Sequence, residues 1–146
     1  MLYHNFGTLV KALTFAERKL TPYKNIEYFI HYLQRYHGTD WIPNSLYSDT
    51  HFSKKVIEHN KNFKVSLISW EPGQHTAFHT HKTSESAFIV LKGKIVESRR
   101  TKDMNVVRSN THFRHTSFIK MDPYRKHKLE NIYAGRAATL HLNIFH

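Results

Sequence analysis

The amino-acid sequence predicts an α+β fold that is mainly β, with two N-terminal helices before a small antiparallel β-barrel or sandwich. Apolar residues recur at helical spacing up to about residue 40, whereas turn residues divide the chain from about residue 50 into short strand-like segments. Many short strands after helices are typical of one α+β unit around a shared core. We therefore expect a single domain over residues 1–146, helical over about 1–40 and a β-barrel over about 50–146.

The two expected helices each carry an apolar stripe. The first stripe ends before Pro22 and contains Leu9, Val10, Leu13, Phe15 and Ala16. The second ends at Gly38 and contains Ile26, Phe29, Ile30, Leu33 and Tyr36. We interpret both stripes as packing surface rather than as a ligand-binding face, and residues 41–45 as a loop.

The remaining chain predicts strands separated by turns. We expect them at 63–70, 87–91, 95–100, 115–121, 126–133 and 138–145, with 95–100 as the hairpin partner of 87–91 across Gly93. The last strand places Thr139, His141 and Asn143 on one face and apolar residues on the other. A polar outer face and a polar face lining a wet cavity both fit this alternation, and periodicity does not choose between them.

Composition limits the classes of protein and site. The chain has no cysteine, so disulfides, thiolate metal sites and a cysteine nucleophile are excluded, and a metal site would need nitrogen or oxygen ligands. No apolar stretch is long enough to cross a bilayer, and the N-terminus lacks a signal-peptide pattern. We expect a cytoplasmic protein with no membrane partner. The oligomeric state stays open.

The chain is strongly basic, with 22 Lys+Arg against 11 Asp+Glu and a net charge of +11. Such a balance favours adsorption to polyanions. The densest basic run, residues 92–102, contains no aromatic residue and has the pattern of a solvated strand pair. We therefore do not expect a dedicated nucleic-acid partner.

Histidines in two clusters carry most of the functional information. His79 and His81 follow Gly73 as Gly-x5-His-x-His, and His127 and Asn131 form His-x3-Asn. Residues two apart on a strand share a face, so the imidazoles of His79 and His81 can converge, and His127 could complete a facial set of metal ligands. The alternative is chance proximity, since the chain holds 13 histidines.

With these motifs assembled, the chain resembles the cysteine dioxygenase family of thiol dioxygenases in the cupin superfamily. The resemblance extends over nearly the whole chain, in this order: residues 38–41, 52–57, 69–73, His79 with His81, 88–93, 127–131 and 140–142. It implies a cupin-type barrel that holds one Fe(II) through His79, His81 and His127. It also implies that O2 oxidises the thiol of cysteine, or of a related small aminothiol, to a sulfinic acid.

Glu85 is the open question in the ligand set. The generic cupin motif adds a glutamate ligand. In that motif six residues separate the glutamate from a glycine, and with Gly93 as the glycine this position falls on Ser86. Adjacent strand residues face opposite sides, so Glu85 would point away from the metal. We expect three neutral ligands, with Glu85 in a supporting role and a Glu85 carboxylate ligand as the alternative. Such a site keeps the metal's double positive charge and favours a coordinating thiolate.

Three positions depart from the family pattern. Lys54 stands at the arginine that binds the substrate carboxylate, which keeps the charge without the bidentate fork; a solvated surface lysine is the alternative. Ser86 stands at the cysteine that crosslinks to a tyrosine in some members. Asn143 stands at the family's tyrosine, while Thr139 and His141 keep the other two members of its polar relay.

An amide cannot release a proton as a phenol can, so Asn143 predicts slower chemistry, another substrate or no oxygenation. Trp70 and Tyr124 are also expected near the site, and Tyr124 is an alternative source of a phenol. Two other functions stay open: a metal-holding cupin of another type, such as a different oxygenase or an isomerase, and a non-catalytic cupin that binds a polyanion or protein.

Overall fold

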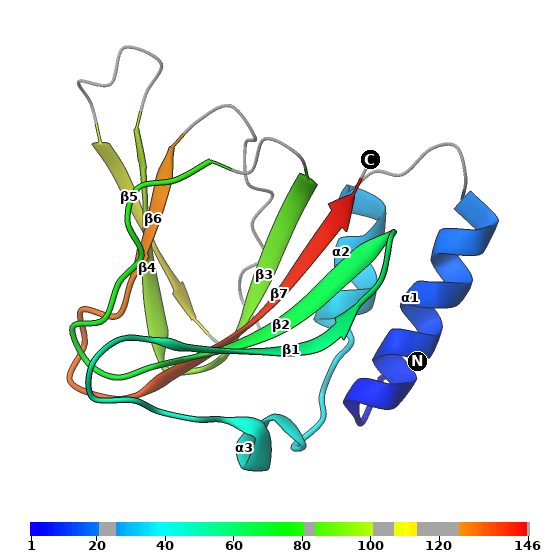
Figure 1. Ribbon diagram of the computed structural model, residues 1–146, viewed down its shortest axis with the longest axis horizontal. Helices are drawn as coiled ribbons and strands as arrows, with labels where there is room; N and C mark the ends of the chain where they lie inside the picture. Colours follow the sequence, from blue (N-terminus) through cyan, green and yellow to red (C-terminus); the bar gives the residue numbers. More distant parts are fainter. Residues whose placement is uncertain (21–25, 81–83, 101–106, 114–125, 146) are drawn as a thin grey trace.

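The structure is a computed structural model that describes residues 1–20, 26–80, 84–100, 107–113 and 126–145. Helices α1 (Phe6–Leu20) and α2 (Ile26–Gln34) cover one side of a four-stranded antiparallel sheet, and a three-stranded sheet lies on the other side (Figure 1). The larger sheet has the order β1 (Ser53–His59), β2 (Phe63–Trp70), β7 (Ala137–Phe145) and β3 (Ser84–Lys92). The smaller has the order β5 (Val107–Phe113), β4 (Lys94–Arg100) and β6 (His127–Glu130). The fold is therefore mainly β with antiparallel sheets and a few helices, as the sequence predicts.

The two faces of the larger sheet have different partners. Alternate residues of β2, β3 and β7, such as Leu67, Ile89 and Leu140, pack against the buried stripes of α1 and α2. The intervening residues, such as Ile68, Phe88 and Trp70, pack toward Ile95 and Leu129 of the smaller sheet in a second cluster. Each strand therefore supplies one face to the helical core and the other to the space between the sheets.

This arrangement settles the orientation of the closing strand. Leu140, Leu142 and Ile144 belong to the core under the helices, so Thr139, His141 and Asn143 face the space between the sheets. The polar alternation of β7 therefore lines an interior cavity instead of an outer surface. In β2, the half-buried Lys64 and the buried Ser66 lie on this same inner face, because Val65 and Leu67 belong to the helical core.

The hairpin predicted across Gly93 is wrong, because β3 pairs with β7 while β4 pairs with β5 and β6. Gly93 instead carries the chain from one sheet to the other. Its φ of +73° lies in the left-handed region that favours glycine. A Cβ there would also lie 2.6 Å from the carbonyl oxygen of Arg136. The sequence signals for a sharp turn and for a strand after it were correct, but the expected pairing partner of that strand was wrong.

Other local predictions also differ from the structure, and strand β1 was not among those predicted. Residues 41–45 are not wholly a loop, because Trp41–Asn44 forms the short helix α3, where the Asn44 amide and Ser45 hydroxyl donate to the carbonyl oxygens of Asp40 and Trp41. Phe15 of the first stripe is 58% exposed. The strand expected at 126–133 ends at Glu130, and β5 was missed because its sequence is largely polar.

The strand expected at 115–121 lies outside the described residues. Within the described part of the chain, no helix combines the length and apolar content needed to span a membrane.

Replacing Gly93 with alanine is expected to destabilise the fold. The new Cβ would require a left-handed backbone conformation and would collide with main-chain atoms that cannot swing away. We expect a loss of at least about 2 kcal/mol in the free energy of unfolding, measured by urea denaturation. Gly135→Ala is the control, because a Cβ there meets nothing within 4 Å, and it should change stability by less than about 0.5 kcal/mol. Equal effects of the two substitutions would contradict this account of the turn.

Candidate metal centre

The backbone brings two of the three predicted ligands side by side. The N–H of His79 donates to the carbonyl oxygen of His127 over 2.9 Å, and the N–H of His127 donates back to His79 over 2.9 Å. The two residues thus form an antiparallel bridge as a directly opposed, hydrogen-bonded pair. Opposed residues place their side chains on the same face, so the two imidazoles point into the same space.

The turn before His79 is held by the second motif. Gly73, with φ +85°, donates its N–H to the carbonyl oxygen of Asn131 over 2.7 Å, and Asn131 donates back to Gln74 over 2.9 Å. The fully buried Asn131 amide also donates to the carbonyl oxygen of Gly135 over 2.9 Å. Asn131 therefore explains the His-x3-Asn spacing as a structural residue that fixes the segment carrying His79 against β6.

The two ring nitrogens that face each other are Nε2 of His79 and Nε2 of His127, 3.1 Å apart. Nδ1 of His79 lies 2.8 Å from the carbonyl oxygen of Ala77, which only accepts, so Nδ1 carries the proton and donates. Nδ1 of His127 lies 3.0 Å from the carboxylate of Glu97 and donates in the same way. In the neutral rings, both Nε2 lone pairs are then directed at one position.

Burial keeps His79 in the form that a metal requires. Burial lowers the pKa of His79, the hydrogen bond to Ala77 partly opposes this, and the charges of His127 and Lys54 lower the pKa further. A histidine with a lowered pKa is neutral near pH 7, and the neutral ring is the metal ligand.

Glu97 anchors the second imidazole from behind. Its carboxylate is 1% exposed, accepts a hydrogen bond from Nδ1 of His127, and accepts another from Nε of Arg99 over 2.7 Å. Burial alone raises the pKa of Glu97, but the hydrogen bonds from His127 and Arg99 and their charges outweigh it, so the pKa lies below its ordinary value. An ionised carboxylate behind a histidine fixes the tautomer and makes Nε2 a stronger donor to a metal.

The donor set fits a divalent metal ion. Two histidine nitrogens that each lie about 2.1 Å from one ion are at most about 4.2 Å apart, and the 3.1 Å separation of the two Nε2 atoms is within that limit. Both histidines use Nδ1 in the supporting hydrogen bonds that metal-bound histidines normally make. His81, the third predicted ligand, lies outside the described residues, and within those residues no group of three His, Cys, Asp or Glu side chains is placed to hold an ion.

The two imidazoles open into a cavity of about 440 Å³ between the sheets. Of the predicted site residues, Lys54, His79, His127, His141 and Asn143 line it. The rest of the described wall is Phe52, Lys64, Ile68, Thr76, Ala77 and Leu129. No acidic side chain belongs to this part of the wall, so the cavity combines imidazole and ammonium groups with an apolar surface.

A buried hydrogen-bonded chain supports His141. The indole N–H of Trp70 donates to Oγ1 of Thr139 over 2.9 Å, and that hydroxyl shares a 2.7 Å hydrogen bond with Nε2 of His141. Phe88 stacks on the His141 ring with centroids 5.2 Å apart. Trp70 and Thr139 thus fix the orientation of His141 at the cavity wall from behind, where neither belongs to the described lining.

Ser86 and Asn143, the two residues that differ from the family's cysteine and tyrosine, lie next to each other in the structure. These residues are directly opposed on β3 and β7, and the Asn143 amide donates to Oγ of Ser86 over 2.6 Å and to Oγ of Ser84 over 3.3 Å. By the resemblance, Ser86 stands at the crosslinking cysteine of some family members and Asn143 at the tyrosine of the polar relay, and here the two positions are joined by a hydrogen bond between two small polar groups.

Glu85 lies on the other face of β3 from Ser86. Its carboxylate accepts a hydrogen bond from the backbone N–H of Ile26, the first residue of α2, over 2.9 Å. A carboxylate at a helix N-terminus satisfies one of the free N–H groups and the helix dipole. The structure therefore places Glu85 under the helices and away from His79 and His127.

The sequence left two roles open for Lys54, a carboxylate-binding residue and a solvated surface lysine. Its side chain fits both descriptions, because it is exposed and also lines the cavity. Partial desolvation lowers its pKa, and the charge and proximity of Lys64 lower it further. Tyr124, the alternative phenol, lies outside the described residues.

Sequence reasoning missed Glu97 and Lys64. Glu97 is the one acid in the basic run 92–102 and lies two residues after Ile95, so strand alternation predicts that it shares the buried face of Ile95. A buried acid in a basic strand is a signal for a paired role. Lys64 alternates with Phe63 and Val65 in the same way, but nothing in the sequence indicated which face of that strand meets the cavity.

Several solved structures have a similar fold, and some of them are described as cupins. A protein from Thermus thermophilus matches with a TM-score of 0.64 at 17% identity, over 73% of this chain and 95% of its own. A cupin superfamily protein from Desulfitobacterium hafniense matches with a TM-score of 0.57 at 11% identity, over 69% and 84%. A recombinant oxalate oxidase in complex with glycolate matches with a TM-score of 0.57 at 12% identity, over 67% and 53%. At these identities the likeness concerns the fold alone.

The sequence comparison identifies the family. The profile of cysteine dioxygenase type I matches residues 13–145, and this chain belongs to that family. A search of curated proteins finds no match.

Replacing Glu97 with glutamine is expected to weaken metal binding. The amide keeps the shape and an acceptor oxygen but removes the negative charge behind His127, so Fe(II) affinity should fall by about tenfold or more. The measurement is anaerobic competition with a chromogenic chelator. Glu130→Gln is the matched control, since Glu130 pairs with Lys128 near the surface. Unchanged affinity in a folded Glu97→Gln protein would contradict the role of this carboxylate.

Proposed function

We propose that this protein is an Fe(II)-dependent thiol dioxygenase that converts a small thiol to a sulfinic acid. The carrying observation is the convergence of the His79 and His127 Nε2 atoms at 3.1 Å, with both Nδ1 atoms already donating. Membership of the cysteine dioxygenase type I family supports this reaction class, and that family typically uses iron and dioxygen. The product follows from adding both atoms of O2 to the thiol sulfur, with no other reactant required.

The bound iron would supply the oxygen chemistry, and His79, His127 and, by the resemblance, His81 would hold it. Three neutral imidazoles leave its positive charge uncompensated, which favours a substrate thiolate over a thiol. The other residues of the wall bind and orient. Lys54 offers a charge for an anionic group, and the exposed position of its side chain places that charge at the cavity mouth.

The wall of the cavity formed by β7 offers hydrogen-bonding groups, but its described residues include no phenol. His141, held by Thr139 and Trp70, is a fixed polar group that can donate or accept at the substrate. Asn143 already donates to Ser86 and Ser84, so its amide contributes to the shape of the wall. Proton movement at this wall would therefore depend on His141 rather than on the tyrosine of other family members.

The direct test is metal content together with oxygen uptake. Freshly purified protein is expected to contain about one iron per chain and to consume O2 when cysteine or cysteamine is added under reducing conditions. His127→Ala should lose both iron and uptake, whereas His59→Ala, an exposed histidine outside the cavity lining, should keep both. Iron-loaded protein that consumes no O2 with any small thiol would contradict the proposal. Full occupancy by nickel, manganese or zinc would instead favour a metal-holding cupin of another type.

A second test concerns the missing phenol. If a phenol at position 143 speeds the reaction, Asn143→Tyr should raise kcat for cysteine, and Asn143→Phe should not, because its ring lacks the ionisable hydroxyl. The two variants remove the same hydrogen bonds to Ser86 and Ser84, so they differ only in the phenol oxygen. Equal kcat values for Tyr and Phe would show that the family's tyrosine role has no counterpart in this cavity.

A further inference from the structure

The described residues of the cavity carry more positive charge than the proposed reaction requires. Lys54 on β1 and Lys64 on β2 both line the cavity that His79 and His127 enter. Among the described residues, no carboxylate forms a salt bridge with either ammonium group, and none belongs to the cavity wall. A divalent ion and two ammonium groups carry more charge than a thiolate and one carboxylate neutralise.

The two lysines act on the same space. Lys64 is directly opposed to Asn143 on β7, so it lies next to the wall position that the family's tyrosine occupies. Lys54 is opposed to Ile68, which has its side chain in the cluster between the sheets. Partial desolvation lowers the pKa of Lys54, and the charge of Lys64 lowers it further. The two ammonium groups are therefore close enough to interact.

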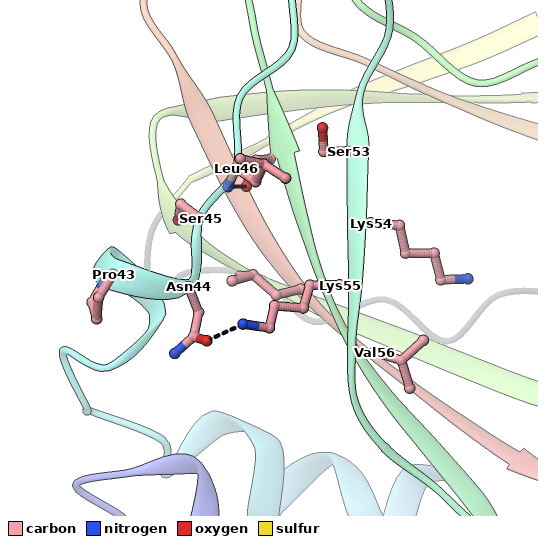
Figure 2. A pocket seen from close by; sticks show the side chains of 10 residues that line it. Pro43, Asn44, Ser45, Leu46, Ser53, Lys54, Lys55 and Val56 are labelled. Atoms are coloured by element: carbon pink, nitrogen blue, oxygen red, sulfur yellow. Dashed lines mark hydrogen bonds between the residues drawn. The ribbon is translucent and has the colours of Figure 1, made fainter.

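The neighbouring lysine shows that this placement is specific. Lys55 points to the opposite side of β1, where its ammonium donates to Oδ1 of Asn44 in a separate pocket beside α3 (Figure 2). Lys54 also borders this pocket, but in the same view its side chain extends to the other side of β1 from that of Lys55. The ammonium group of Lys55 therefore lies in the outer pocket, whereas the preceding residue of β1, Lys54, lines the cavity that contains the imidazoles.

We propose that the cavity binds a small thiol whose tail carries two negative charges, anchored by Lys54 and Lys64. This inference rests on the proposed function for the thiol end and on the lysine pair for the tail. Two lysines act as separate point charges rather than as a planar fork, so they match two carboxylates or one phosphate ester better than a single carboxylate. The second charge distinguishes this substrate class from cysteine.

The tail is tested without thiol or metal. Succinate should bind the metal-free protein about tenfold more tightly than butyrate at low ionic strength, measured by calorimetry. Lys64→Gln should remove most of this preference, Lys64→Arg should retain it, and Lys55→Gln, on the outer face, should leave it unchanged. Equal affinity for succinate and butyrate in the unmodified protein would overturn the inference, as would a Lys64→Gln variant that keeps the full preference.

The complete substrate is tested by turnover. KM for 2-mercaptosuccinate should be about tenfold below that for 3-mercaptopropionate, which lacks one carboxylate, and Lys64→Gln should raise the first KM selectively. A third arm uses 2-mercaptoethyl phosphate to distinguish a phosphate tail from a dicarboxylate tail. Oxygen uptake with cysteine but no preference for either dianionic thiol would overturn this inference and leave the proposed function intact. Lysine-dependent binding of succinate without any oxygen uptake would support the tail site and contradict the proposed function.

Discussion

The whole site depends on the reciprocal backbone pairing of His79 with His127. This pairing joins two segments that are distant in the sequence and directs both imidazoles into the space between the sheets. Glu97 then determines what the pairing can do chemically. Its buried carboxylate holds the proton of His127 on Nδ1, so Nε2 has a free lone pair. Without the Glu97 carboxylate, the neutral His127 ring could carry its proton on either nitrogen. In the tautomer with the proton on Nε2, that atom could not bind the same metal ion as Nε2 of His79.

The larger sheet separates stability from chemistry by alternation alone. In β3 and β7, one set of alternate side chains packs under α1 and α2, while the other set, which includes Ser86, His141 and Asn143, faces the space between the sheets. Glu85 shows how strict this separation is, since a shift of one residue moves a carboxylate from the cavity side of the sheet to the start of a helix. The inner face can therefore change its polar residues while the apolar packing of the outer face keeps the strand in register.

Much of this architecture is visible in the sequence because it depends on local periodicity. The stripe of α2, strand β2 and the turn at Gly93 all follow from spacing and glycine chemistry. The His-x-His and His-x3-Asn spacings predicted a metal site, and of the three proposed ligands the described residues bring His79 and His127 together. The pairing of the strands could not be predicted from local periodicity. A tight turn at Gly93 looks the same whether the chain returns to the same sheet or crosses to the opposite one, and only tertiary packing decides. Glu97 and Lys64 were missed for a related reason, because their roles depend on which partner meets the inner face of each strand.

The hydrogen bond between Asn143 and Ser86 has a consequence for how the protein reaches its working form. Joining a cysteine to a tyrosine through a thioether removes two hydrogen atoms, so such a pocket is finished only after an oxidative event following folding. An amide and a hydroxyl need no oxidant, and the present pair forms as soon as β3 and β7 align. Because the chain has no cysteine, this pair of positions needs no oxidation step after folding, and its hydrogen bond does not depend on earlier exposure to oxygen.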